Sequence, residues 1–518
     1  MENRLSTLLA QRDRRRDLAQ RQPAQAHQQG LRATTQVAAA LSICLSLASC
    51  CTAPAPAAPP NILLIVGDDQ GYADLSCAGL IQDVKTPNLD ALARRGVRFT
   101  NSYSTSPICN ASRAGLVTGC YQQRFGTFWY GGKGIHDARF TTLPELLAGQ
   151  GYTTGYIGKV HYGSGKTAQP NNRSFPLQHG FDSFYGCFGG RKHYLIHNKA
   201  AEQAFLADKR QFKRKGQSLR KGPMWVGAER QDQEGLSTEL FGQRARKFLQ
   251  ANSGDGKKPF FLQLAFNAVH NFTHQLPAEY LRKHNLQGYH DWDPTKEDYY
   301  DWYHNGRKPN NPEGRAHYLG QLHYLDREIG KVLACLDELQ MRDNTVVIYL
   351  ADNGGSTPIY ADNTPLRGSK YTLYEGGIRI PMIVSWPGQF EAGAVRSNVI
   401  SAFDLLPTIC AATGTATPAH IDGKDLGPLL SGQNPTVGHH TLVWDTGHET
   451  AVRHGNWKLK TASSKNHADY EMVALEIGTF LFDLSEDPSE TTDLAAKHPD
   501  VVKQLQKIHQ AWKAGLAF

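Results

Sequence analysis

The chain has 518 residues, of which 40% are hydrophobic and 20% charged, and it carries a formal net charge of +8. This composition is ordinary for a globular protein and excludes both a disordered chain and a membrane protein with many spans. The positive charge favours anionic partners only weakly, because arginines in the first 32 residues and basic residues at 192–221 supply much of it.

The first sixty residues are typical of a targeting segment. Arg32 precedes the apolar run Val37–Leu47, which is too short to span a bilayer as a structural helix but long enough for a signal peptide. The run ends in Leu47-Ala48-Ser49-Cys50, which resembles the lipobox of bacterial lipoproteins and predicts lipidation at Cys50. A plain secretory signal is the alternative. We therefore expect an exported protein, in the periplasm or at the outer membrane or cell surface, that contacts a membrane only through a lipid anchor.

From residue 61 onward, strand-like apolar runs alternate with segments of helical periodicity, which predicts an open, largely parallel sheet covered on both faces. After residue 430, short alternating strands and one amphipathic helix predict a small antiparallel subdomain. The expected domains are a leader and linker over 1–60, an α/β domain over 61–430 and a subdomain over 431–518. The expected elements are Ile62–Val66, Asn88–Arg95, Phe260–Phe266, Leu319–Leu339, Val346–Leu350 and Met382–Trp386, then Leu442–Trp444, Ala451–Lys460, Phe480–Leu484 and the helix Pro499–Ala514.

Carboxylates follow two of the predicted strands at the point where each strand ends. Asp68 and Asp69 come after the first strand, and Asp352 and Asn353 come after Val346–Leu350. Open α/β sheets bind ligands beyond the carboxyl ends of their strands. An oxygen-only set of this kind suits a hard cation such as calcium or magnesium rather than zinc or copper. Helix capping by the first pair and a simple turn at the second are the alternatives.

A cysteine and several cations follow other predicted elements. Cys109 comes after a loop, and Arg113 lies one helical turn later on the same face. This geometry would suit a nucleophile beside a cation that binds an anion, whereas a buried cysteine with a solvated arginine is the alternative. The strand Gly155–Ile157 is followed by Lys159 and His161, which places cations at a third strand end.

The pattern Cys109-x-Ala111-x-Arg113, followed by Thr118-Gly119, resembles the signature of the formylglycine-dependent (type I) sulfatases, an arylsulfatase-like family of the alkaline phosphatase superfamily. The resemblance covers almost the whole mature chain. It implies an alkaline-phosphatase-like α/β/α sandwich with a large mixed central sheet and a small C-terminal antiparallel subdomain. Further segments that match the family in order are Asn61–Tyr72, Thr86–Asp90, Gly158–His161, Gly180–Asp182, Phe184–Gly186, Phe266–His270, Asp352–Gly355, Pro365–Lys370 and Glu375–Pro381.

The resemblance also implies the reaction, which is removal of sulfate from a sulfated carbohydrate. Cys109 would be oxidised to formylglycine, whose hydrate attacks sulfur beside a calcium ion, with magnesium as the second choice. The implied metal ligands are Asp68, Asp69, Cys109, Asp352 and Asn353. The implied catalytic residues are Cys109, Arg113, Lys159, His161, His270 and Lys370, of which Lys159, His270 and Lys370 also bind substrate.

The implied roles follow the charges that develop in the reaction. The arginine and the two lysines would offset negative charge on the transferred group, and His270 with Lys370 would protonate the departing alcohol. His161 would take a proton from the remaining diol hydroxyl, which expels sulfate and restores the aldehyde. Ala111 stands where proline is usual and is associated with radical-type maturation. The expected partners are therefore the substrate and a formylglycine-generating or radical sulfatase-maturating enzyme, with no nucleic acid.

Two other functions stay open on the sequence: a phosphonate or phosphate ester hydrolase of the same superfamily, and an unmodified glycan-binding lipoprotein. Three features bear on specificity without deciding it. The aromatic stretch Tyr289–Tyr303 would stack on sugar rings or pack on the core. His274 would contact substrate or be a polar loop residue, and the basic residues at 192–221 would steer a polyanion or form a solvated face.

Overall fold

The computed structural model describes residues 58–163, 168–189, 194–196, 224–254, 256–287, 289–290, 297, 301–302, 305–308, 310–463 and 476–516. The predicted leader and its lipidation site Cys50 lie outside these residues. Pro59–Phe518 forms one compact unit, and the predicted division of it at residue 430 stays a prediction. Among the helices of the described part, none is long and apolar enough to cross a membrane.

The main sheet has ten strands within the described residues. They are β1 (Asn61–Gly67), β2 (Val97–Phe99), β4 (Thr153–Lys159), β5 (Ser183–Cys187), β7 (Met224–Val226), β8 (Glu229–Gln231), β10 (Phe260–Ala265), β11 (Thr345–Ala351), β12 (Met382–Ser385) and β13 (Ala394–Arg396). Their order is β13-β2-β12-β11-β1-β10-β4-β5-β7-β8. The central strands β11, β1, β10, β4 and β5 run parallel, with Ile62 of β1 opposite Val346 and Phe261. Antiparallel strands flank them on both sides, so the sheet is mixed.

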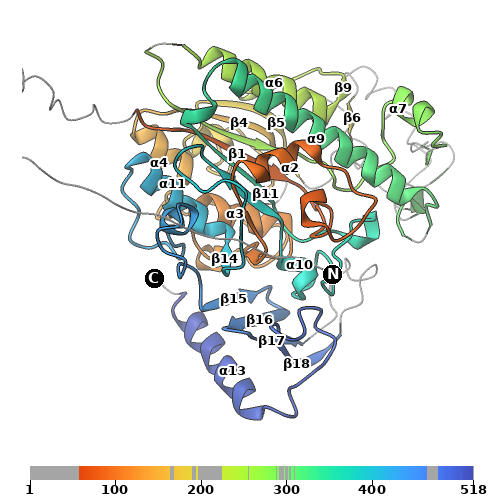
Figure 1. The fold of residues 1–518 in the computed structure, drawn as a ribbon, viewed down its shortest axis with the longest axis vertical. Coiled ribbons are helices and arrows are strands. Elements are labelled where there is room, and N and C mark those ends of the chain that lie inside the picture. The colour runs from red at the N-terminus through yellow and green to blue at the C-terminus, as the bar shows by residue number, and fades with distance from the viewer. Residues whose placement is uncertain are drawn as a thin grey trace, which may run out of the picture. The chain divides into compact units, whose positions relative to one another are not determined.

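Helices cover both faces of this sheet (Figure 1). Side chains of β1 alternate between the two faces, because successive residues of a strand point in opposite directions. Leu63 and Ile65 pack in one core with α2 (Pro87–Arg94), α6 (Ser237–Ala251) and α9 (Gly314–Glu338). Ile62 and Leu64 pack in the other core with α3 (Cys109–Thr118), α4 (Leu143–Gly149), α11 (Leu405–Thr413) and α12 (Gly427–Leu430). The predicted α/β/α sandwich is confirmed.

The C-terminal part adds a second sheet. Its four antiparallel strands are β15 (Thr441–Asp445), β16 (Glu449–His454), β17 (Trp457–Ala462) and β18 (Gly478–Asp483). Helix α13 (Pro499–Ala514) packs on this sheet through buried Leu505. The prediction of one strand over Ala451–Lys460 is wrong, because the chain reverses at Gly455-Asn456 and forms a hairpin. Gly455 has φ 60°, the left-handed conformation that a tight hairpin turn needs.

Shorter elements connect these layers. The two-stranded pairs join β3 (Ser102–Tyr103) to β14 (Ile400–Ser401), and β6 (Leu195–Ile196) to β9 (Gly235–Leu236). Two short helices are α7 (Ala278–Lys283) and α10 (Glu375–Ile378). The loop between β11 and α10 carries Lys370, so this segment brings a further predicted site residue toward the strand ends.

Candidate active site

Four neighbouring strands, β11, β1, β10 and β4, end at the same edge of the main sheet because they run parallel. The residues that follow them, or end them, are the ones that the sequence singles out. This edge therefore gathers most of the predicted site, and it is where open α/β sheets bind ligands. In strand order the residues are Asp352 and Asn353 after β11, Asp68 and Asp69 after β1, His270 after β10, and Lys159 and His161 at the end of β4.

The backbone at these strand ends is tightly constrained. Gly158, in β4, has φ 116°, and an added Cβ would lie 1.8 Å from the carbonyl oxygen of Ala265 in β10. Only glycine fits there, so it allows the close strand pairing that delivers Lys159 to the edge. Asp69 and His161 also adopt left-handed φ values, 61° and 60°. Such conformations are costly for residues with side chains and cluster at functional sites.

Cys109 lies at the centre of this edge. It is the first residue of α3, is fully buried, and its Sγ lies 3.2 Å from Nδ1 of His161 and 3.9 Å from Nζ of Lys370. Burial raises the pKa of the Cys109 thiol. Arg113 is one turn further along the same helix, as predicted. Its Nε donates to Oδ2 of Asp352 at 2.8 Å, and its Nη1 donates to the carbonyl oxygen of Lys159 at 2.9 Å.

Three buried carboxylates lie among three buried cations. Asp352 pairs with Arg113, and Asp68 pairs with Lys159 and lies 3.6 Å from Nη2 of Arg113. Asp69 accepts from Nζ of Lys370 at 2.7 Å, and its other oxygen accepts from Nδ2 of Asn353 at 2.8 Å. Although burial alone would lower the pKa of Lys370, Asp69 beside it holds that pKa well above its usual range. Each of the three carboxylates therefore has at least one buried cation beside it.

The same residues fit a metal ion. Oxygen atoms of Asp68 and Asp352 and the sulfur of Cys109 all lie within 4.8 Å of one another. Oδ1 of Asp68 and Oδ1 of Asn353 are buried without a hydrogen-bond partner among the described residues. Such atoms are costly unless something else satisfies them. Burial raises the pKa of Asp68 to about 8, so its ionised form needs more positive charge than the lysine and arginine supply. A hard divalent cation would satisfy both needs.

His270 completes the predicted set. Its Nε2 lies 3.4 Å from Oδ2 of Asp69, and its Nδ1 lies 3.9 Å from Oδ2 of Asp68. Burial, followed by the nearby lysines Lys370 and Lys159, lowers the pKa of His270 well below its usual value. The ring is therefore neutral in this arrangement, with one N–H to donate. All ten predicted metal and catalytic residues among the described residues thus lie together.

The loop that carries Lys370 is held by two carboxylates of the C-terminal part, one in β16 and one in the loop after β18, which the sequence did not indicate. Oε2 of Glu449 accepts from the backbone N–H of Leu373 at 2.8 Å, and Oε2 of Glu490 accepts from the N–H of Glu375 at 2.6 Å. Both carboxylates are fully buried and are paired with lysines of β17, Lys460 and Lys458 respectively. Alternating lysines on a strand usually indicate a solvated face; here they are buried against acidic partners.

The buried Glu490 that holds the Lys370 loop predicts a pH effect on stability. Burial, with Glu375 nearby, raises the pKa of Glu490 from 4.5 to about 7. A carboxyl whose pKa is raised on folding stabilises the protein fully below pH 4.5 and loses that contribution as the pH rises to 7. Glu490→Gln keeps the acceptor but cannot ionise. Between pH 4.5 and 7.5, we expect the free energy of unfolding of wild type to fall by up to about 3 kcal/mol relative to that of this variant. Urea unfolding of both proteins at each pH measures the difference, and a constant difference would contradict the pKa.

Two residues that were candidates for substrate specificity, Trp302 and His274, are buried. Trp302, from the aromatic stretch, is fully buried and stacks on Phe272, which favours the packing interpretation for this residue. Of the other residues in that stretch, Tyr289 contacts it, while Trp292 and 298–300 lie outside the described residues. His274 is buried against the rings of Trp302 and Tyr289. The basic stretch also lies mostly outside the described residues.

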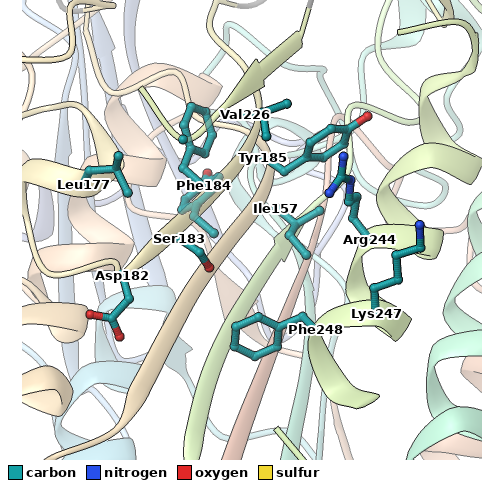
Figure 2. A pocket seen from close by; sticks show the side chains of 12 residues that line it. Ile157, Leu177, Asp182, Ser183, Phe184, Tyr185, Val226, Arg244, Lys247 and Phe248 are labelled. Atoms are coloured by element: carbon teal, nitrogen blue, oxygen red, sulfur yellow. The ribbon is translucent and has the colours of Figure 1, made fainter. Parts of the chain in front are cut away.

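A separate pocket of about 380 Å³ lies between β4, β5 and α6 (Figure 2). Two of its polar groups have partners: Asp182 accepts from Thr154, and the guanidinium of Arg244 lies 4.5 Å from the ring centroid of Tyr185. None of the predicted site residues lines it. The lining residues are Tyr156, Ile157, Leu177, Asp182, Ser183, Phe184, Tyr185, Val226, Gly227, Arg244, Lys247 and Phe248.

Comparison with known proteins places these residues in a family. The Sulfatase family model matches residues 60–415, and the model described as N-sulphoglucosamine sulphohydrolase, C-terminal, matches 369–514. Arylsulfatase A of Bos taurus is 31% identical over 509 residues, which cover 90% of each chain. An N-acetylgalactosamine-6-O-sulfatase of Bacteroides thetaiotaomicron is 27% identical over 88% of this chain and 93% of its own. The solved structure of Ps i-CgsB in complex with k-i-k-neocarrahexaose has a TM-score of 0.70 and 26% identity, covering 88% of this chain and 92% of that one.

The family match spans the strand ends, α3 and the Lys370 loop, and the relatives match almost end to end. The family model and the relatives together show that the chain belongs to the sulfatase family of sulfate ester hydrolases.

Proposed function

We propose that this sulfatase removes sulfate from a sulfated carbohydrate by using a formylglycine made from Cys109. The observation that carries this proposal is the position of Cys109. Its sulfur lies at the start of α3, within 4.8 Å of carboxylate oxygens of Asp68 and Asp352 that could hold a metal, and beside His161 and Lys370. A cysteine kept only for packing would not need three cations, three carboxylates and two histidines around it.

Formylglycine would replace the thiol with an aldehyde, whose hydrate supplies one hydroxyl to attack sulfur and a second through which sulfate is later expelled. A calcium ion, or magnesium as second choice, would lower the pKa of the attacking hydroxyl and polarise a sulfate oxygen. The chain's own residues would hold that ion through Asp68, Asp352 and residue 109. Asp69 and Asn353 would complete the ligands.

The cations of the site would bind the sulfate group. Arg113, Lys159 and Lys370 are buried and fixed by hydrogen bonds, so they need little reorganisation as negative charge develops on the transferred oxygens. Lys370 holds a proton at Nζ, and the neutral ring of His270 can donate its N–H to the same departing oxygen. Lys370 would transfer its proton to the alcohol that leaves, and the N–H of His270 would hold the same oxygen by a hydrogen bond.

His161 would act as the base of the second step, because its Nδ1 lies 3.2 Å from the sulfur position of residue 109. We expect His161→Asn to release the alcohol product in a burst of about one equivalent per active site. Sulfate release should then be slower than in wild type by roughly 10²–10³-fold, since the general base is lost. Rapid-quench measurement of both products checks this. Equal slowing of alcohol and sulfate release, without a burst, would place His161 in the first step instead.

The carbohydrate part of the proposal has separate support. One relative is named for removing sulfate from N-acetylgalactosamine, and one structural neighbour binds a neocarrahexaose. A screen against defined sulfated mono- and oligosaccharides, with nitrophenyl sulfate and nitrophenyl phosphate beside them, tests the substrate class. We expect turnover of at least one sulfated saccharide and a higher kcat/KM for nitrophenyl sulfate than for the phosphate. A much faster phosphate reaction would favour a phosphate or phosphonate ester hydrolase.

Maturation and export also belong to the proposal. Ala111, two residues after Cys109, favours a radical sulfatase-maturating enzyme over a formylglycine-generating enzyme as the modifying partner. The predicted signal and Cys50 favour an exported lipoprotein. Metabolic labelling with a fatty-acid analogue in wild type and in Cys50→Ala tests the anchor. Label that persists in the variant would contradict lipidation at Cys50.

A further inference from the structure

Three aromatic rings and a histidine lie together beside Cys109. This group, Trp129, Tyr130, Tyr371 and His448, is called here the aromatic cluster. The ring centroid of Trp129 lies 4.5 Å from His448, 5.7 Å from Tyr130 and 6.5 Å from Tyr371. The rings come from three distant parts of the chain, namely the loop after α3, the Lys370 loop and the turn between β15 and β16. The fold thus builds this group in space.

The aromatic cluster adjoins the residues around the reacting sulfur. The ring of Tyr130 stacks on His161, with centroids 6.0 Å apart and planes at 26°. Nζ of Lys370 lies 5.4 Å from the ring centroid of Tyr371. His161 and Lys370 both contact the sulfur of Cys109. In space, a single side chain, that of His161 or of Lys370, therefore separates the cluster from the position where sulfate would be transferred.

Trp129 and Tyr130 pack on a small core that includes Tyr371, but their own rings stay partly exposed. Trp129, Tyr130 and His448 are half-buried, whereas Trp302 in the core is fully buried. Tyr371, which the two rings of the loop contact, is 7% exposed and supports them. Part of the surface of each outer ring is therefore open to a ligand. Aromatic faces next to polar groups suit the apolar faces of sugar rings, whose edges carry hydroxyls.

The parts that carry the cluster are firmly held. Nε2 of Gln123 donates to the carbonyl oxygen of Asp445 at 2.7 Å, which ties the region after α3 to β15. The turn that carries His448 closes through hydrogen bonds between Thr446 and Glu449, and Glu449 is itself bound to the Lys370 loop. Rings fixed before the ligand arrives lose little conformational freedom on binding.

We propose that the aromatic cluster is the binding site for the sugar ring that carries the sulfate ester, with Trp129 as the principal stacking surface. The inference rests on the proposed function, because it takes the substrate to be a sulfated sugar. In such an ester a ring carbon is joined to sulfur through the ester oxygen alone. When the ester is exocyclic, one further carbon lies between the ring and that oxygen. The ester oxygen is the one that Lys370 would protonate, so a sulfate seated at Cys109 places its ring beside Lys370, which lies against the Tyr371 ring of the cluster.

The test compares ring-bearing and ringless substrates. Wild type, Trp129→Ala and Trp129→Phe are assayed with the sulfated saccharide that wild type hydrolyses best and with a short alkyl sulfate that has no ring. We expect Trp129→Ala to raise KM for the saccharide roughly tenfold with kcat changed much less, as expected for loss of one ring contact. Trp129→Phe should recover most of the loss. The alkyl sulfate should be hydrolysed equally by all three proteins.

The control is Trp386→Ala, which removes another half-buried tryptophan that packs on Phe390 away from the cluster. This variant should hydrolyse both substrates as wild type does. If wild type hydrolyses a saccharide but its KM changes less than twofold in Trp129→Ala, the cluster is not the sugar site and the proposed function stands. A loss of the same size with the alkyl sulfate would also overturn the inference. If wild type hydrolyses nitrophenyl sulfate but no saccharide, the carbohydrate substrate is wrong and the assigned ligand falls with it. Tyr130→Ala gives a second reading if Trp129→Ala does not fold.

Discussion

Cys109→Ala is expected to abolish turnover, with kcat reduced at least ~10⁴-fold, because the side chain that would become the nucleophile is gone. The change is small in volume and leaves the surrounding ion pairs in place, so the protein should fold. Sulfate release is measured by ion chromatography, and folding by circular dichroism. A residual rate within tenfold of wild type would show that another group attacks sulfur.

Cys335→Ala is the matched control for this substitution. Cys335 is also buried and free, but it lies on α9, which packs against the face of the sheet that α3 does not cover. Both variants remove one buried thiol, which should cost each protein about 1 kcal/mol of stability. We expect Cys335→Ala to retain activity within about threefold. The contrast between the two variants therefore separates loss of chemistry from loss of packing.

Asp68→Asn is expected to lower kcat/KM by roughly 10³-fold and to weaken calcium binding at least ~100-fold, because it removes one charged oxygen ligand and half of a buried ion pair. Oδ1 of Asp68 has no hydrogen-bond partner among the described residues, and Oδ2 pairs with Lys159. Isothermal titration of the chelator-treated protein with calcium gives the affinity independently of activity. Unchanged calcium affinity in this variant would remove Asp68 from the metal site.

Two controls accompany the metal experiment. Chelation of wild type should abolish activity, and calcium should restore it, whereas restoration by magnesium alone would reverse the expected order of the two ions. Asp337→Asn removes an exposed carboxylate that pairs with Arg95 at the surface. Surface pairs contribute little, so this variant should match wild type in both calcium binding and turnover.

The layers of the fold could be predicted because β1, β10 and β11 are nearly continuous apolar runs and α9 keeps helical spacing of its apolar residues over 25 residues. Buried parallel strands leave that signature in a sequence. The hairpin at Gly455-Asn456 was missed, since apolar and polar residues keep alternating on both sides of the turn. The antiparallel strands at the edges, such as β7 and β8, are three residues long and leave too little pattern to recognise.

The site residues at the strand ends could be found because the position of a residue after a strand is visible in the sequence. Cys109, Asp68 and Asp352 do lie together, and their roles stay predictions. Residues that act from a distance could not be found in this way. Glu449 reaches the Lys370 loop from β16 and Glu490 from the loop after β18, and only the tertiary structure brings them there. The rings of the aromatic cluster are likewise far apart in the chain.

The mass of the peptide that carries residue 109 tests the central claim most directly. The protein is produced with a radical sulfatase-maturating enzyme, digested, and analysed by mass spectrometry without alkylation and after treatment with an aldehyde-specific hydrazine. The proposal predicts a peptide in which the CH₂SH group has become CHO, which reacts with the hydrazine, in proportion to the sulfatase activity of the sample. An active preparation in which every copy of this peptide retains its thiol would contradict the account.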